Sequence, residues 1–223
     1  MNRFYMVLGA VVVAGGAFLW YSSSQRGGPA ADQGPVPVVT AADSAFKGYT
    51  LGPDSAPVKI VEYVDYECPI CAEFGALQFP VIKDHLINTG KVQWRQRDFP
   101  LSIHAHSRLA ALATQCAGDQ GKYWEMVDQL FDNHSWALQS RDPTGTFHGF
   151  AQSLGLDLAK YDACVSANTY AGRIQASYAE GEARGVNGTP TLFINGVEYT
   201  GSNRTSDGIQ AVVDDLLKKP KTK

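Results

Sequence analysis

Hydrophobic and polar positions repeat along this chain with two periods, which predict its secondary structure. Residues 58–64 and 91–99 are rich in β-branched and aromatic side chains and are predicted to be strands. Between them, apolar residues recur at helical spacing over 71–86, where Pro80 is expected to bend the helix. From about residue 104 to residue 184 the spacing stays helical. The pattern therefore predicts an α/β fold with a long helical insertion.

The C-terminal part returns to strand character. The apolar run 191–194 is followed by Asn195-Gly196, a strong signal for a tight β-turn, and by a second short run at 197–199. Over 206–218 the apolar residues again have helical spacing. A hairpin and a closing helix are therefore expected.

The N-terminus differs from the rest of the chain because it has a long uncharged stretch. Residues 4–21 carry no charged side chain and follow Arg3; as a helix they would span roughly 27 Å, near the ~30 Å thickness of a bilayer core. We predict that residues 1–21 form a signal-anchor or transmembrane segment, with a cleaved signal peptide as the alternative. Residues 22–48 are small, polar and rich in Gly and Pro, which is typical of a flexible linker. Both alternatives place the remaining domain, residues 49–219, outside the cytoplasm.

Composition narrows the classes of function. The chain has 223 residues, of which 44% are hydrophobic and 18% charged, so it can bury a full core. Its formal net charge of -3 offers no polycationic face, and nucleic acid is therefore not expected as a partner. Four cysteines in an exported chain fit an oxidising compartment.

The motif Cys68-Pro69-Ile70-Cys71 is the candidate reactive site. It lies between the first predicted strand and the first predicted helix, so Cys68 is expected at a helix N-terminus, where free N–H groups and the macrodipole stabilise a thiolate. The spacing lets Cys71 close a disulfide with Cys68. A zinc site is the alternative, but the other two cysteines stand singly, so no metal and no cofactor are expected.

Four residues outside the motif are also candidates for chemistry. Cys116 and Cys164 lie on the apolar faces of two predicted helices of the insertion, which predicts a structural disulfide; two separate buried thiols are the alternative. His104 and His106 are too close in sequence to share one side of a helix. A surface or helix-capping role is therefore predicted for both histidines.

The order of strand, Cys-x-x-Cys helix, strand, helical insertion, hairpin and helix resembles the thioredoxin superfamily, and within it the DsbA-like branch. The likeness rests on residues 56–63 with the cysteine motif, on residues 97–101 and on residues 185–191. It covers residues 49–219. The resemblance implies a thioredoxin fold with an inserted helical subdomain.

The resemblance also implies roles for residues outside the motif. Thr189 and Pro190 would lie beside the redox cysteines, joined by a cis peptide bond, and would contact the backbone of the client protein. Glu62 would be a buried acid whose raised pKa fits it for proton transfer with Cys71, with an exposed edge acid as the alternative. Strongly oxidising relatives have histidine directly before the second cysteine, where this chain has Ile70, so the reduction potential stays open.

Together these features predict a membrane-tethered or secreted thiol:disulfide oxidoreductase, with its catalytic domain on the periplasmic or extracellular side. Its clients would be unfolded or partly folded secreted proteins, and a membrane redox partner would reoxidise or reduce the Cys68–Cys71 pair. A monomer is expected, because the segment before Tyr49 is too short and polar to be a dimerisation domain. A reductase or isomerase on the same fold and a carrier that binds copper through both thiolates are the alternatives.

Overall fold

The computed structural model describes residues 37–138, 142–201 and 204–218. The expected transmembrane or signal segment, residues 1–21, and most of the expected linker lie outside these ranges. Within the described ranges, no helix combines the length and the apolar character needed to cross a membrane.

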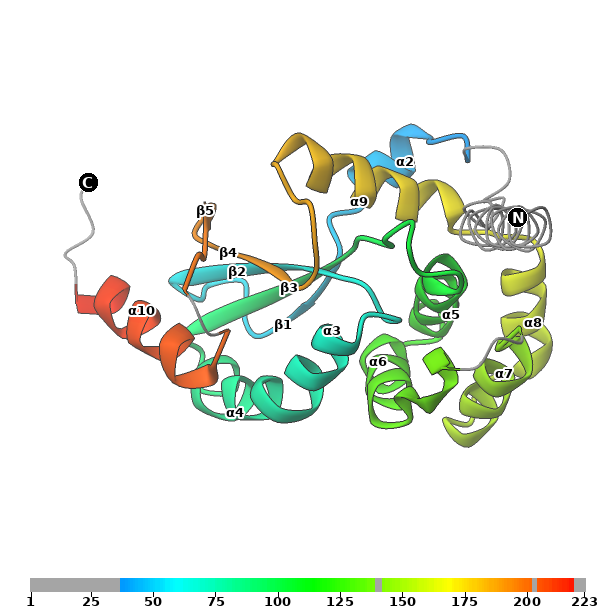
Figure 1. Ribbon diagram of the computed structural model, residues 1–223, viewed down its shortest axis with the longest axis horizontal. Helices are drawn as coiled ribbons and strands as arrows, with labels where there is room; N and C mark the ends of the chain where they lie inside the picture. Colours follow the sequence, from blue (N-terminus) through cyan, green and yellow to red (C-terminus); the bar gives the residue numbers. More distant parts are fainter. Residues whose placement is uncertain (1–36, 139–141, 202–203, 219–223) are drawn as a thin grey trace, which may run out of the picture. The chain divides into compact units, whose positions relative to one another are not determined.

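A five-stranded sheet lies at the centre of the described fold, in the order β1-β3-β2-β4-β5 (Figure 1). The parallel pair β2 (Val58–Val64) and β3 (Val92–Asp98) is mostly buried, as expected for strands covered on both faces. β1 (Tyr49–Leu51) and β4 (Thr191–Ile194) run antiparallel to their neighbours, and β5 (Val197–Glu198) forms the predicted hairpin with β4. The strands predicted from the sequence are confirmed.

The helix after β2 alternates between α-helical and π-helical turns. α3 (Pro69–Glu73) and α4 (Phe79–Ile82) are α-helical, and the π-helical segments η1 (Phe74–Gln78) and η2 (Lys83–Ile87) follow them. Pro80 lies in the first turn of α4, directly after the wider π-helical turn of η1, where its missing N–H group interrupts the helix least. The predicted helix is therefore present, and its irregularity extends well beyond Pro80.

Helices cover both faces of the sheet. α10 (Ser206–Lys218) packs beside α4 on one face, and α9 (Ala171–Ala183) crosses the other face (Figure 1). Ile209 and Val213 of α10 are buried in one cluster with Ile60 and Trp94 of the central strands. This cluster fixes the helix that carries the cysteine motif against the sheet.

The insertion predicted for residues 104–184 is helical. Its elements are α5 (Ser107–Gly118), α6 (Tyr123–Asp132), the 3-10 turn η3 (His134–Leu138), α7 (Thr144–Ser153), α8 (Leu158–Ser166) and α9. The apolar faces of these elements form one buried cluster together with Cys68 and Cys71. The insertion therefore covers one side of the candidate reactive site.

A short helix, α2 (Ala41–Ala45), lies in the stretch that was expected to be a flexible linker, so the linker prediction is wrong for these residues. Thr40 and Asp43 form a reciprocal capping box at its start. The segment is then fixed by Phe46, whose ring lies 4.0 Å from the Arg173 guanidinium and whose carbonyl accepts a hydrogen bond from Arg97. Composition alone predicted flexibility because these partners are distant in sequence.

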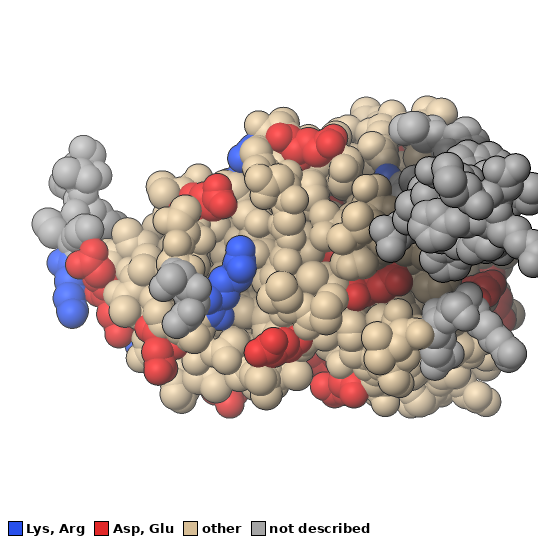
Figure 2. All heavy atoms as spheres, viewed as in Figure 1, with Lys and Arg blue, Asp and Glu red and all other residues tan. Residues whose placement is uncertain are grey.

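Charged side chains are scattered over the face of the molecule seen in Figure 2, among a majority of uncharged ones. Acidic and basic residues do not gather into one large patch on this face.

Candidate active site

Cys68 lies where β2 gives way to α3. It is the N-cap residue of α3, Pro69 is in the first turn, and the backbone N–H of Cys68 donates to the Asp65 carbonyl at 3.2 Å. Proline suits this position because the first N–H groups of a helix have no partner within it. Cys68 and Cys71 are both free thiols, so the structure is that of the reduced protein. The expected place of Cys68 at a helix N-terminus is confirmed.

The surroundings of the two thiols shift their pKa values in opposite directions. A hydrogen bond from the Cys71 thiol, together with backbone N–H groups of α3 and contact with Thr189, lowers the pKa of Cys68 to about 5. Burial and the neighbouring Cys68 sulfur raise the pKa of Cys71 well above its usual value. Near neutral pH, Cys68 is therefore a thiolate and Cys71 a protonated thiol, which is the pairing that an attacking and a resolving cysteine need.

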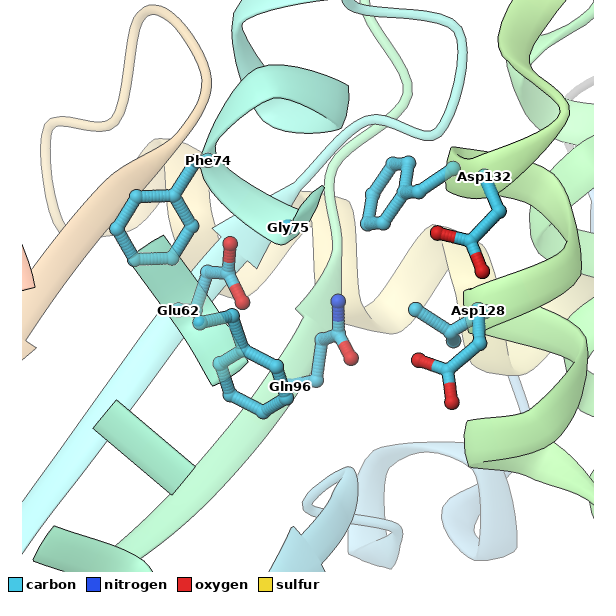
Figure 3. Close-up of a pocket in the computed structure, with 9 residues that line it drawn as sticks. Glu62, Phe74, Gly75, Gln96, Asp128 and Asp132 are labelled. Atoms are coloured by element: carbon cyan, nitrogen blue, oxygen red, sulfur yellow. The ribbon is translucent and has the colours of Figure 1, made fainter. Parts of the chain in front are cut away.

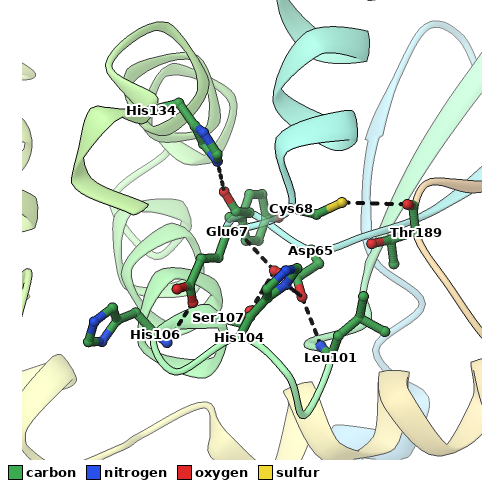
Figure 4. Close-up of polar contacts among 10 residues, drawn as sticks. Asp65, Glu67, Cys68, Leu101, His104, His106, Ser107, His134 and Thr189 are labelled. Carbon is green, nitrogen blue, oxygen red and sulfur yellow. Dashed lines mark hydrogen bonds and ion pairs between the residues drawn. The ribbon is translucent and has the colours of Figure 1, made fainter. Parts of the chain in front are cut away.

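The loop before β4 closes the other side of Cys68. The Thr189–Pro190 peptide bond is cis, and the Cys68 sulfur lies 3.6 Å from the Thr189 carbonyl oxygen (Figure 4). The Thr191 hydroxyl donates to the Gly188 carbonyl within the same loop. The structure therefore brings together the cysteine motif and the proline loop, which lie about 120 residues apart in the chain.

Glu62 is buried within β2 and lies below the helix that carries the motif. It is 4% exposed, and Trp94 Nε1 donates to Glu62 Oε2 at 3.3 Å. Burial raises the pKa of Glu62 to about 8. A cavity of about 20 Å³ borders Glu62, Gln96 and Asp128, and Figure 3 shows it between the strands and α6. Glu62 is thus a buried acid and not an exposed edge residue.

The raised pKa of Glu62 predicts an unusual dependence of stability on pH. The folded protein keeps a proton that the unfolded chain loses above the ordinary value of 4.5, so stability falls as pH rises from there toward 8. At pH 7, Glu62→Gln is expected to raise the free energy of unfolding by about 3 kcal/mol, because one pKa unit corresponds to about 1.4 kcal/mol.

Urea unfolding of both proteins at several pH values tests this expectation. At pH 4 both side chains are neutral, so the two free energies should be equal there. A difference that stays constant from pH 4 to pH 8 would show that the carboxyl does not titrate in this range.

A polar cluster beside Cys68 was missed by the sequence analysis. The His104 ring lies 2.8 Å from the buried Asp65 carboxylate through Nδ1, so the surface role predicted for His104 is wrong (Figure 4). The backbone N–H of His106 donates to the Glu67 carboxylate at 2.6 Å, and His106 precedes α5 without capping it through its side chain. These contacts join segments about 40 residues apart, which no local pattern could indicate.

Cys116 of α5 and Cys164 of α8 are joined by a disulfide, with their Cα atoms 5.8 Å apart. This is the pairing expected from the sequence. The bond ties together two helices of the insertion.

The described residues contain no cluster of three or more His, Cys, Asp or Glu side chains that could hold a metal ion.

Comparison with known proteins assigns this arrangement to a family. Residues 44–215 match a family model described as thioredoxin. The chain belongs to the thioredoxin family. Among solved structures it is similar to α-DsbA1 of Wolbachia pipientis, with 25% identity, 75% of this chain and 89% of that chain covered, and a TM-score of 0.66. It is also similar to BdbD of Bacillus subtilis, with 26% identity, 76% and 92% coverage, and a TM-score of 0.60. The fold of this member of the thioredoxin family is thus similar to that of DsbA-like proteins.

A curated relative shows the same domain within a longer chain. The Na(+)/H(+) antiporter NhaA 1 of Salinispora arenicola is 34% identical over 157 residues, which are 70% of this chain and 23% of the antiporter. The chain therefore spans less than a quarter of the length of the relative that it matches.

Proposed function

We propose that this protein is an exported thiol:disulfide oxidoreductase that introduces disulfides into unfolded secreted proteins. The observation that carries the proposal is a thiolate-forming Cys68 placed between buried Cys71 and the cis Pro190 loop. A low pKa of Cys68 stabilises the reduced form, so the disulfide form accepts electrons readily. This supports disulfide donation although Ile70 stands where strongly oxidising relatives have histidine.

The proposed reaction is two thiol-disulfide exchanges. A client thiolate attacks the Cys68 sulfur of the Cys68–Cys71 disulfide, and Cys71 leaves and takes a proton. A second client thiolate then attacks the client sulfur of the mixed disulfide and releases Cys68 as a thiolate. The client loses two electrons and gains a disulfide, while the protein gains two electrons. A membrane redox partner would return it to the oxidised form.

Glu62 is the proposed proton donor and acceptor for Cys71. Its hydrogen-bond partner is Trp94, so transfer to Cys71 would need a bridging water. A cavity of about 20 Å³ borders the Glu62 side of this path and has room for one water, because a water needs roughly 10 to 15 Å³ measured in this way. Cys71 does not line this cavity, so the remaining step to its sulfur is part of the proposal. The buried Gln96 Oε1 borders this cavity without a partner among the described residues and would accept a hydrogen bond from that water.

Client binding would use the backbone of Thr189 and the apolar surface beside the motif. A loop that ends in Pro190 leaves the preceding backbone free to pair with an extended client segment. Ile70 is 55% exposed next to Cys68 and offers an apolar contact that does not depend on the client sequence.

The proposed setting is the outer side of a membrane, reached through the N-terminal segment as an anchor or a cleaved signal. A similar segment occurs within a chain named as a Na(+)/H(+) antiporter, which supports the proposal that this protein acts next to a membrane. A monomer would suffice, because both cysteines and the proline loop come from one chain.

The test is the oxidation of a reduced, unfolded protein by the stoichiometric, preoxidised enzyme. Disulfides should appear in the client while free thiols appear at Cys68 and Cys71. A titration against glutathione should give the Cys68–Cys71 couple a higher reduction potential than that of thioredoxin. A strongly reducing couple with no client oxidation would instead favour a reductase. Tight uptake of one Cu(I) without any exchange would favour the copper carrier.

A further inference from the structure

The Asp65 carboxylate is the centre of the polar cluster next to Cys68. Asp65 is 1% exposed and accepts hydrogen bonds from the Glu67 N–H at 2.9 Å, the Ser107 hydroxyl at 2.5 Å, the Leu101 N–H at 2.8 Å and His104 Nδ1 at 2.8 Å (Figure 4). A buried carboxylate with this many donors is held in one place, and so is the His104 ring.

This cluster is joined to the reactive cysteine through the backbone. The Asp65 carbonyl accepts the hydrogen bond from the N–H of Cys68, the residue at the N-cap of α3. His104 comes from a different segment, the loop between β3 and α5, and its side chain is 17% exposed. The loop after β3 therefore places an imidazole against the turn that carries Cys68.

The charges around His104 favour its protonated form. The hydrogen bond to Asp65 raises the pKa of His104 most, burial opposes this, and the negative charges of Asp65, Glu67 and the Cys68 thiolate raise it further. Asp65 and Cys68 are three residues apart in the sequence and both carry a negative charge when Cys68 is a thiolate. If His104 were neutral, it would supply no positive charge to offset the repulsion between them. A protonated His104 cancels that repulsion.

We propose that protonated His104, on the loop after β3, is the electrostatic partner of the Cys68 thiolate and supplies the positive charge that Ile70 cannot supply. The protonation of His104 is then linked to the redox state of the Cys68–Cys71 pair. The inference rests on the proposed role of Cys68 as the exchanging thiol. His104 acts through charge and through Asp65, and it is a positioning residue that does not take part in bond exchange.

The linkage follows from charge balance. Reduction of the disulfide by two client thiolates adds two electrons; Cys71 takes up one proton and Cys68 remains a thiolate. The new negative charge at Cys68 raises the affinity of His104 for its proton. The protonated fraction of His104 therefore increases, and the protein takes up a fraction of a proton in addition to the one on Cys71. Oxidation removes the thiolate and releases that fraction. Because coupling is reciprocal, His104 must stabilise the thiolate by the same factor.

The first measurement uses the protein without any substitution. The pKa of His104, followed by NMR of its ring protons, should be higher in the reduced than in the oxidised form by about 0.5 unit or more, the scale expected for a nearby charge. An equal His104 pKa in the two forms would overturn the proposal. This measurement needs no client, so its outcome is independent of whether the protein oxidises secreted proteins.

The second measurement compares variants by the ultraviolet absorbance of the Cys68 thiolate against pH. His104→Asn keeps a donor for Asp65 but carries no charge, so the Cys68 pKa should rise by about 0.5 to 1 unit. The equilibrium with glutathione should shift toward the disulfide by roughly 3- to 10-fold. His104→Arg keeps the charge and should preserve the low pKa.

His148→Asn is the matched control. His148 forms the same kind of pair, 2.9 Å from Asp162, on α7 and α8, and its loss should leave the Cys68 titration unchanged. A Cys68 titration in His104→Asn that matches the wild type would contradict the proposal. Should His104→Asn not fold, the comparison of oxidised and reduced wild-type protein decides alone.

Discussion

In a Cys71→Ala variant, Cys68 is expected to stay covalently linked to client proteins and turnover is expected to stop. Cys68 can still exchange with a client disulfide, because its low pKa arises partly from the backbone N–H groups of α3 and from Thr189. The mixed disulfide then persists because the buried thiol that normally resolves it is missing. Non-reducing electrophoresis and mass spectrometry of the linked peptides should locate the bond at Cys68.

Cys68→Ala is the matched variant for this experiment. It leaves only the buried Cys71, which is 0% exposed and has a raised pKa, so few or no linked clients should accumulate. Linked clients found on Cys71 in Cys68→Ala, and none on Cys68 in Cys71→Ala, would reverse the assigned roles. Because Pro190 follows Thr189, whose carbonyl oxygen lies 3.6 Å from the Cys68 sulfur, replacing Pro190 should alter the lifetime of the trapped species.

The parts of the fold that the sequence predicts are those set by local signals. β2, β3 and the hairpin at Asn195-Gly196 follow from side-chain alternation and turn chemistry, and the insertion follows from helical spacing. The cis bond at Pro190 and the burial of Glu62 were predicted from the family resemblance and not from periodicity. Local pattern and resemblance together therefore predicted most of the reactive site.

The parts that the sequence does not predict depend on contacts between distant segments. Asp65 reads as an ordinary residue at a strand end, and only the folded chain shows that it anchors His104. The same holds for α2, whose capping box is local but whose position depends on Arg97 and Arg173. Because tertiary contacts decide both features, spacing in the sequence could not reveal them.

The second large effect is expected from removal of the Cys116–Cys164 disulfide. The bond closes a loop with a sequence separation of 48 and joins α5 to α8. In the chain-entropy model, a loop of this length stabilises the folded state by about 4 kcal/mol, a large part of the ~5 to 15 kcal/mol that domains commonly have. The double variant Cys116→Ala and Cys164→Ala should lose about this much in urea unfolding.

The double variant is the sharper choice, because a single replacement would leave one thiol in the buried cluster that also contains Cys68 and Cys71, where it could form wrong disulfides. Both proteins are compared with the Cys68–Cys71 pair oxidised, so that the only covalent difference lies in the insertion. Client oxidation per folded molecule should be unchanged, because the reactive thiols belong to α3 and its N-cap. A loss below about 1 kcal/mol would mean that side-chain packing, rather than the bond, holds α8 against α5.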